Sequence, residues 1–486
     1  MRFTLILLSC IITLSAGAQR DGGHGKFRED FTEANLLMEE GYYNQALELW
    51  LQLYNEDPSN ANLNYKIGLC YLKSVNEKDK ALDYLEYAER ARTADYSSFN
   101  ISDYDPYDSR ERNAPKETGY YLAEAYLLNY ELDKAHLGFM SAAEGLGKRH
   151  QLYEPSKRGL EVTKNAKKQL SNPRMDITII NMGPVINDEY NDFSPVISVD
   201  ENALFFTSRR LRSDSTNANL VDDRDGQYYE DIYVSYRNRN GEWQDPELLS
   251  INEPSQHSAT INVSIDGQEL YIYKDNDGGG DIYQSALVGE TWSYPEKLSS
   301  DINSSYWETH SAKSADGNTL YFVSDRPGGY GGRDIYRCVK LPNGQWSKAL
   351  NLGPKVNTQY DDDAPFIHPD GKTLYFASKG HNSMGGFDIF NTQIDSRGDW
   401  SVPENIGYPI NTVDDDVFYV TSADSRRAYF SSDREGGYGR KDIYMVELPV
   451  PEDVNSLAVL KGFVIPTEGQ SIPANTMVTI TGNETG

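Results

Sequence analysis

The chain has 486 residues, a formal net charge of -28 and a sequence pI near 4.6. Its length predicts about three domains. Nucleic acids and anionic membrane surfaces require a basic footprint, so this charge argues against both as partners and leaves cationic surfaces and proteins.

Residues 1–18 have the composition of a secretory signal. Arg2 is followed by an apolar run at 5–14 and by small residues at 16–18. The run is about half the length that spans a bilayer, which disfavours a membrane anchor. We expect cleavage near Ala18 and export to the periplasm. Cys10 lies inside the run, so simple cleavage is favoured over lipidation there.

Two cysteines remain after cleavage, Cys70 and Cys338, and they lie in different segments. This spacing excludes a disulfide framework. Both are predicted to behave as small buried hydrophobic residues.

Residues 27–172 show helical periodicity with small and aromatic residues at the offsets of tetratricopeptide (TPR) repeats. The three copies comprise Ala34, Leu37, Gly41, Ala46, Trp50, Leu53 and Pro58; a looser Gly68, Tyr71, Ala81, Leu85 and Ala88; and Ala123, Tyr126, Tyr130, Ala135, Phe139 and Ala142. Three repeats are about the minimum for a stable array. We expect a capping helix at 160–170 and a surface loop at 93–116. The concave face of such arrays binds peptides or protein surfaces.

Residues 175–450 carry a second repeat made of β-type segments. Asp-Ile-Tyr or a near copy recurs at intervals of 50 to 54 residues, and a tryptophan follows the first four copies; the landmarks are Asp231, Asp281, Asp334, Asp388 and Asp442, with Trp243, Trp292, Trp346 and Trp400. Such a period is typical of a propeller, whose units bury their faces on one another. We expect four strands per unit, the fourth carrying the tryptophan.

The fifth unit lacks its tryptophan strand. Residues 181–187 resemble residues 351–357, the fourth strand of another unit, yet they precede the first unit. We therefore predict a five-bladed β-propeller closed by an N-terminal strand at about 176–187, which leaves no long unpaired edge.

Two short β patterns follow, at 460–464 and 477–480. Residues 455–486 are too few to bury a core of their own. We interpret this segment as the start of a β-sandwich cut short at Gly486.

No nucleophile elbow, zinc-binding helix motif or phosphate loop occurs, and the seven histidines show no ligand spacing. The sequence therefore predicts that the chain is not an enzyme. No catalytic residue and no cofactor is assigned, calcium excepted as a hypothesis.

That hypothesis concerns a ring of polar residues. Five positions after the Asn that opens each unit stand four carboxylates and a histidine: Asp192, His257, Glu308, Asp362 and Asp416. They should begin the innermost strands and surround one mouth of the central channel. We favour the interpretation that each acid caps a turn through neighbouring N–H groups; the alternative is a bound cation such as calcium. Residues 275–281 are also calcium-like, but a Gly-rich turn is favoured there.

Residues 324–336 (SDRPGGYGGRDIY), 193–195 (FSP) and 206–210 (FTSRR) resemble the WD-repeat-like (TolB-type) propeller of Bacteroidetes OmpA-family envelope proteins. In that family helical repeats, a propeller and a carboxypeptidase-regulatory-like sandwich follow in this order. The resemblance implies a non-enzymatic periplasmic scaffold at the outer membrane that binds envelope proteins, among them subunits of the type IX secretion and gliding apparatus. The family's peptidoglycan-binding OmpA-type domain is missing from this sequence.

The alternative function is a secreted glycan- or peptide-binding propeller. Glycan binding would require the four repeat tryptophans to be exposed, whereas their place in the repeat favours packing.

Overall fold

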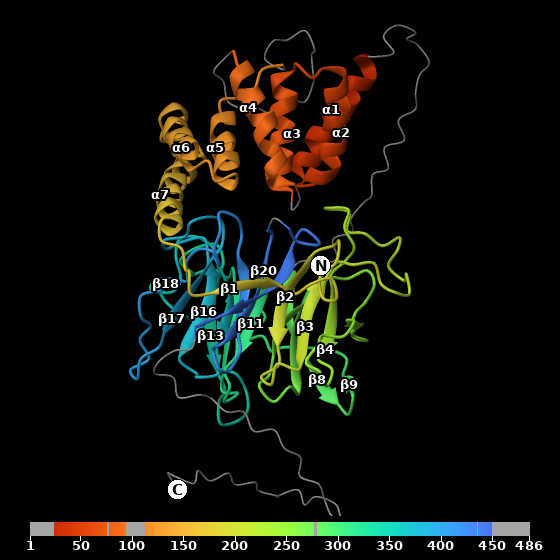
Figure 1. The fold of residues 1–486 in the computed structure, drawn as a ribbon, viewed down its shortest axis with the longest axis vertical. Coiled ribbons are helices and arrows are strands. Elements are labelled where there is room, and N and C mark those ends of the chain that lie inside the picture. The colour runs from red at the N-terminus through yellow and green to blue at the C-terminus, as the bar shows by residue number, and fades with distance from the viewer. Residues whose placement is uncertain (1–23, 75–76, 94–111, 277–278, 435, 450–486) are drawn as a thin grey trace, which may run out of the picture.

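The computed structural model describes residues 24–74, 77–93, 112–276, 279–434 and 436–449, with helices first and strands after them (Figure 1). The predicted signal peptide, the predicted sandwich and most of the predicted loop at 93–116 lie outside these residues. Across the described ranges, none of the helices combines the length and the apolarity needed to cross a membrane. Cys70 and Cys338 are free and buried, as predicted.

The described helical part contains seven α-helices and a short 3₁₀ turn. They are α1 (His24–Glu39), α2 (Tyr43–Glu56), α3 (Ala61–Lys73), η1 (Lys78–Lys80), α4 (Ala81–Ala91), α5 (Thr118–Leu128), α6 (Leu132–Leu146) and α7 (Tyr153–Leu170). Each helix packs on the next in sequence. The predicted helical region is confirmed, while its assignment to the TPR family stays a prediction.

Close helix packing depends on the small residues of the repeat. A Cβ added at Gly68 would lie 2.5 Å from the Leu85 side chain, and one at Gly159 would lie 2.6 Å from the Phe139 ring. Asn60 begins α3 by accepting hydrogen bonds from two backbone N–H groups of the first turn. The small positions therefore let large buried neighbours fill the space between helices.

The strands that the structure describes form five antiparallel sheets, the blades of a propeller. Blade 1 holds β2 (Asp192–Ile197), β3 (Ala203–Ser208), β4 (Asp231–Tyr236) and β5 (Glu247–Leu248). Blade 2 holds β6 (Ser258–Val263), β7 (Glu269–Asn276), β8 (Gly279–Val288), β9 (Thr291–Trp292) and β10 (Glu296–Lys297). Blade 3 holds β11 (Glu308–Lys313), β12 (Thr319–Ser324), β13 (Asp334–Val339) and β14 (Leu350–Asn351). Blade 4 holds β15 (Asp362–Ile367), β16 (Thr373–Ser378), β17 (Asp388–Gln393) and β18 (Glu404–Asn405). Blade 5 holds β19 (Val417–Thr421), β20 (Arg427–Ser432), β21 (Asp442–Glu447) and β1 (Thr178–Asn181).

Blade 5 confirms the predicted closure. Strand β1 pairs antiparallel with β21, with Thr178 opposite Glu447 and Asn181 opposite Tyr444. A strand from ahead of the ring thus completes its last blade, and the edge of β21 is covered.

The Asn that opens each unit has a structural role. The Asn187 Oδ1 accepts the Ile443 N–H at 2.8 Å, and its Nδ2 donates to the Ile443 carbonyl at 2.9 Å. The same two-bond clamp joins Asn252 to Ile232, Asn303 to Ile282, Asn357 to Ile335 and Asn411 to Ile389. The Asn and the Ile of Asp-Ile-Tyr recur together because they bond to each other.

The tryptophans lie slightly before the places predicted for them. Trp243, Trp346 and Trp400 form single bridges ahead of the short fourth strands, and Trp292 ends β9. Trp400 is buried and the other three are half-buried. All four pack against the blade cores.

The helical array sits on one mouth of the propeller (Figure 1). From α7, Arg158 donates to the carbonyls of Lys379 and Gly380 in blade 4 at 2.8 and 2.9 Å. Lys78 pairs with Asp414 beside blade 5 at 2.6 Å. Asn44 of α2 donates to the Asp225 carbonyl of blade 1 at 2.9 Å. The array therefore rests on blades 1, 4 and 5.

Candidate binding site at the propeller mouth

Three of the five predicted ring residues, Asp192, Glu308 and Asp362, begin innermost strands, and Asp416 immediately precedes a fourth, β19. Each carboxylate is buried and accepts the backbone N–H of the residue four positions earlier: Asp192 from Asp188, Glu308 from Ser304, Asp362 from Thr358 and Asp416 from Thr412. Serine hydroxyls of the neighbouring strand donate to three of them, at Glu308, Asp362 and Asp416. These acids hold turns within their own blades.

Burial has an electrostatic consequence for these acids. It raises the pKa of Asp192 and of Asp362 to about 7 and that of Asp416 to about 6. Within the described ranges, no group of three or more His, Cys, Asp or Glu side chains is arranged to hold a metal ion. Each carboxylate of the predicted ring is bonded inside its own blade, and a bound cation stays a prediction.

His257 does not occupy the equivalent position. Ser258 of β6 pairs with Lys274 of β7, just as Asp192 of β2 pairs with Ser208 of β3. The Ser258 N–H donates to the carbonyl of Glu230, which precedes the third strand of blade 1, and the Asp192 N–H donates in the same way to Lys441, which precedes the third strand of blade 5. Blade 2 therefore has one additional residue after its Asn. This shift places His257 ahead of β6, where its side chain contacts Asp222, Glu230 and Arg224.

That network lines a cavity of about 310 Å³, which we call the mouth pocket. Its aromatic residues are Phe193, Tyr273, Trp307 and Phe418, its histidines are His257 and His310, and its charged residues are Arg209, Asp222, Arg224, Asp225, Glu230, Asp275 and Arg333, with Ala259 and Thr309 between them. Blades 1, 2 and 3 supply most of this lining. The pocket lies where their innermost strands begin.

His257 lies between two carboxylates. Its Nε2 is 2.9 Å from Asp222 Oδ2 and its Nδ1 is 3.4 Å from Glu230. Burial lowers the pKa of His257, but the two carboxylates outweigh burial and the net shift is upward. His257 therefore carries a proton over more of the physiological pH range than a free histidine.

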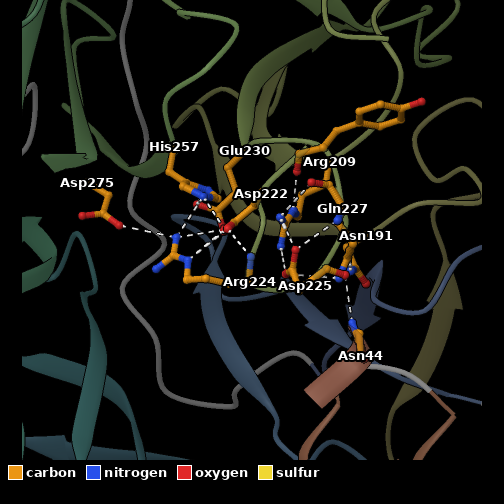
Figure 2. A network of polar contacts seen from close by, with 11 residues as sticks. Asn44, Asn191, Arg209, Asp222, Arg224, Asp225, Gln227, Glu230, His257 and Asp275 are labelled. Carbon is orange, nitrogen blue, oxygen red and sulfur yellow. Dashed lines mark hydrogen bonds and ion pairs between the residues drawn. The ribbon is translucent and has the colours of Figure 1, made fainter. Parts of the chain in front are cut away.

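Arg224 contacts the same group (Figure 2). Its Nε is 3.1 and 3.0 Å from the two Asp222 oxygens, and its Nη2 is 3.1 Å from His257 Nε2 and 3.6 Å from Asp275. Burial opposes ionisation of Asp222, yet hydrogen bonds from Arg224 lower the pKa of Asp222 to about 2. Asp222 is therefore an anion at every physiological pH.

The same polar network reaches the helical array. Asp225 is paired with Arg209, and its backbone carbonyl accepts a hydrogen bond from Asn44 of α2 at 2.9 Å (Figure 2). One continuous set of contacts thus links the pocket to the docked helices.

Aromatic side chains form the apolar part of the pocket. Phe418 has φ +60°, a left-handed conformation that non-glycine residues seldom adopt, and its ring packs on Phe193 and on His310. The Trp307 Nε1 donates to the Tyr273 hydroxyl at 2.8 Å, which fixes the indole at the rim while 45 % of the residue stays exposed. Ser194 and Ala364, the equivalent residues of blades 1 and 4, also have positive φ at the same register shift, so this conformation belongs to the bulge of the repeat.

The length of one connection in the sequence indicates this pocket. The connection between β3 and β4, residues 209–230, is much longer than its counterpart 325–333 in blade 3. It supplies five lining residues, Arg209, Asp222, Arg224, Asp225 and Glu230. Comparing the spacing of Ser208 and Asp231 with that of Ser324 and Asp334 would have located the insertion.

The chain matches no family model and no curated protein. Solved structures similar to it include a TolB-type protein from Agrobacterium tumefaciens, 17% identical, covering 56% of this chain and 98% of that chain with a TM-score of 0.34. A gluconolactonase from Xanthomonas campestris is 14% identical, covering 58% and 92%, with a TM-score of 0.32. An α-L-arabinofuranosidase from Lactobacillus brevis is 12% identical, covering 55% and 91%, with a TM-score of 0.35. At these identities the likeness concerns the propeller fold alone.

One prediction is corrected by these comparisons. The chain was predicted not to be an enzyme, but the similar structures are mostly enzymes, including also a puromycin hydrolase and prolyl endopeptidases. Missing motifs exclude only the enzyme classes that carry them, so the exclusion of catalysis was wrong. Calcium stays a prediction: one similar structure, a β-xylosidase/α-arabinofuranosidase, is in a calcium-free form, which concerns that protein.

Proposed function

We propose that the chain is a periplasmic adaptor that binds envelope proteins with the surface formed by its helical array and propeller mouth. One observation carries the proposal. Arg158 and Lys78 hold the array on the propeller, so two repeat domains of a kind that commonly binds proteins present one continuous surface. A docked pair of this type positions partners relative to each other.

The resemblance of the propeller motifs adds the finer assignment. It is to the secretion-system component PorE, and it supports a place in the type IX secretion and gliding apparatus at the outer membrane. TPR repeats, a cleaved signal peptide and a carboxypeptidase-regulatory-like sandwich belong to the same proposal. Peptidoglycan anchoring, in this proposal, belongs to the OmpA-type domain of that family.

Capture from envelope fractions tests the proposal. The tagged chain, cross-linked in membranes and identified by mass spectrometry, should recover secretion-system subunits. An undocked variant, Arg158→Ala, should recover fewer, because the joined surface is broken. Recovery of no envelope protein by the wild-type chain would contradict the proposal.

The alternative of a secreted glycan-binding propeller is less well supported. Its repeat tryptophans are buried or half-buried against blade cores, which leaves little indole surface for sugar stacking. Retention on immobilised envelope polysaccharides, without protein recovery, would favour it.

Hydrolysis in the mouth pocket is a second candidate function. It is favoured by His257, an imidazole held between Asp222 and Glu230 at the wall of a cavity, where it can act as a general acid or base. Turnover of lactone, arabinoside or peptide substrates that is lost in His257→Asn would establish it. Absence of turnover across these substrates would contradict hydrolysis and leave the adaptor role as the proposed function.

A further inference from the structure

We propose that the mouth pocket binds a basic side chain, lysine or arginine, of a partner protein. This inference deepens the proposed function and rests on it, because the side chain would belong to one of the bound envelope proteins. Three features of the pocket carry it: its charge, its aromatic rim and the guanidinium that it already holds.

The first feature is an excess of carboxylates. Arg209 and Arg333, two of the three arginines in the lining, are already neutralised by Asp225 and Asp363. Asp222, Glu230 and Asp275 contact Arg224 and His257, and Arg209 also helps to lower the pKa of Glu230. The lining holds four carboxylates, Asp222, Asp225, Glu230 and Asp275, against three arginines, so with His257 and His310 neutral the pocket attracts an added positive charge.

Two of these carboxylates have weak partners. Glu230 is 3.4 Å from the His257 ring, and Asp275 is 3.6 Å from Arg224. The Asp275 side chain is one-third exposed (33 %). Both distances exceed those of good charge-assisted hydrogen bonds, which leaves acceptor capacity for a ligand.

The second feature is the aromatic rim. Trp307 is anchored by Tyr273 and still presents nearly half of its surface to solvent. A cation placed over an aromatic face is attracted by the ring quadrupole, and Trp is the best such face. Aromatic faces beside incompletely paired carboxylates suit a lysine or arginine and disfavour an anion.

The third feature is Arg224 itself. Its guanidinium contacts Asp222, His257 and Asp275, although 60 % of the side chain is exposed. The pocket thus already recognises one basic side chain, supplied by its own chain. A partner's side chain would share or displace this position.

Access to the pocket is open on one side. The polar contacts described between the array and the propeller go to blades 1, 4 and 5. Trp307 and Asp275 belong to the side of blades 2 and 3. A partner segment can therefore enter beside the docked helices.

The test measures binding of a glycine-flanked arginine peptide to the full chain by calorimetry, with the change in tryptophan fluorescence that Trp307→Ala abolishes as a second readout. Matched peptides carry citrulline, which keeps the shape without the charge, or glutamate. The arginine peptide should bind and the other two should not. Asp275→Asn, Glu230→Gln and Trp307→Ala should each weaken binding about two- to fivefold, the usual range for a part-exposed ion pair or cation–π contact. Glu290→Gln, which removes an exposed charge of the same blade away from the pocket, should change nothing.

Arg224→Ala gives the sharpest result, because it removes the competing guanidinium. Binding of the arginine peptide should tighten about two- to fivefold. An anion site would show the opposite: the glutamate peptide would bind, and Arg224→Ala would abolish its binding. That result, or no saturable binding of the arginine peptide by the folded wild-type chain, would overturn the proposal. Envelope-protein capture without peptide binding would refute this inference alone, whereas peptide binding without capture would refute the adaptor function.

Discussion

Replacing Arg158 with alanine should undock the helical array from the propeller. Its guanidinium donates through Nη2 to the Lys379 and Gly380 carbonyls at 2.8 and 2.9 Å and to Ser383 Oγ at 2.7 Å. It also lies 4.9 Å from the centre of the Tyr360 ring. The side chain is only 13 % exposed, so water does not replace these contacts in the docked state.

The magnitude follows from the number of hydrogens available. Nη2 carries two, so it makes about two strong bonds, each worth about 1.5–3 kcal/mol when a charged group is lost. Ordering the side chain costs up to about 2 kcal/mol, which the alanine variant regains. We expect docking to weaken by about 3 kcal/mol, roughly a hundredfold in the docking equilibrium.

Calorimetry and small-angle scattering measure the effect. The wild-type chain should melt with coupled domains and scatter as one compact particle, while Arg158→Ala should melt in two steps and have a larger radius of gyration. Lys157→Ala is the matched control, since Lys157 is the neighbouring cation, is 53 % exposed and pairs only within α7. Identical melting and scattering for wild type and Arg158→Ala would refute the reasoning.

Three further predictions concern stability. Asn187→Ala should cost about 1–3 kcal/mol by leaving the Ile443 N–H unpaired, while the Ile443 carbonyl keeps its bond from the Met182 N–H, and dilution light scattering should show self-association through the loosened edge of β21; a wild-type denaturation midpoint would contradict it. Burial raises the pKa of Asp362 to about 7, so its stabilising contribution is full below about pH 4 and is lost as pH rises through 7. Relative to wild type, Asp362→Asn should therefore gain about 2 kcal/mol or more between pH 4 and 8 in urea unfolding, and a pH-independent difference would refute this. Gly159→Ala should destabilise the array by about 1–3 kcal/mol through its clash with Phe139, whereas Gly145→Ala, with open space around it, should be neutral or slightly stabilising in the same thermal melts.

The propeller could be predicted from sequence because its signals are local and repeated. The Asn and the Ile of Asp-Ile-Tyr bond to each other in every blade, and the tryptophan covers the same apolar face each time. Because each blade uses the same local contacts, the same residue pattern occurs five times in the sequence. The closure of the ring could be predicted for the same reason. The fourth-strand pattern that precedes the first unit could pair with the free edge of the fifth unit, which lacked its own fourth strand.

The mouth pocket could not be predicted in this way. Its residues come from blades 1, 2, 3 and 5, and five of them lie in the irregular connection at 209–230 of blade 1, which is much longer than its counterpart in blade 3. A single additional residue before β6 moved His257 out of the predicted ring and beside Asp222.

The sequence by itself determined the order of helices and strands, the number of blades and the strand that closes the ring, because short-range patterns encode them. Only the tertiary structure decided that the buried acids serve their own turns and that the helices cover one mouth. It also decided that His257, Arg224 and Asp275 meet at that mouth. Contacts between distant segments depend on the register of the strands and on the path of the loops, and the side-chain pattern along one strand does not specify either of them.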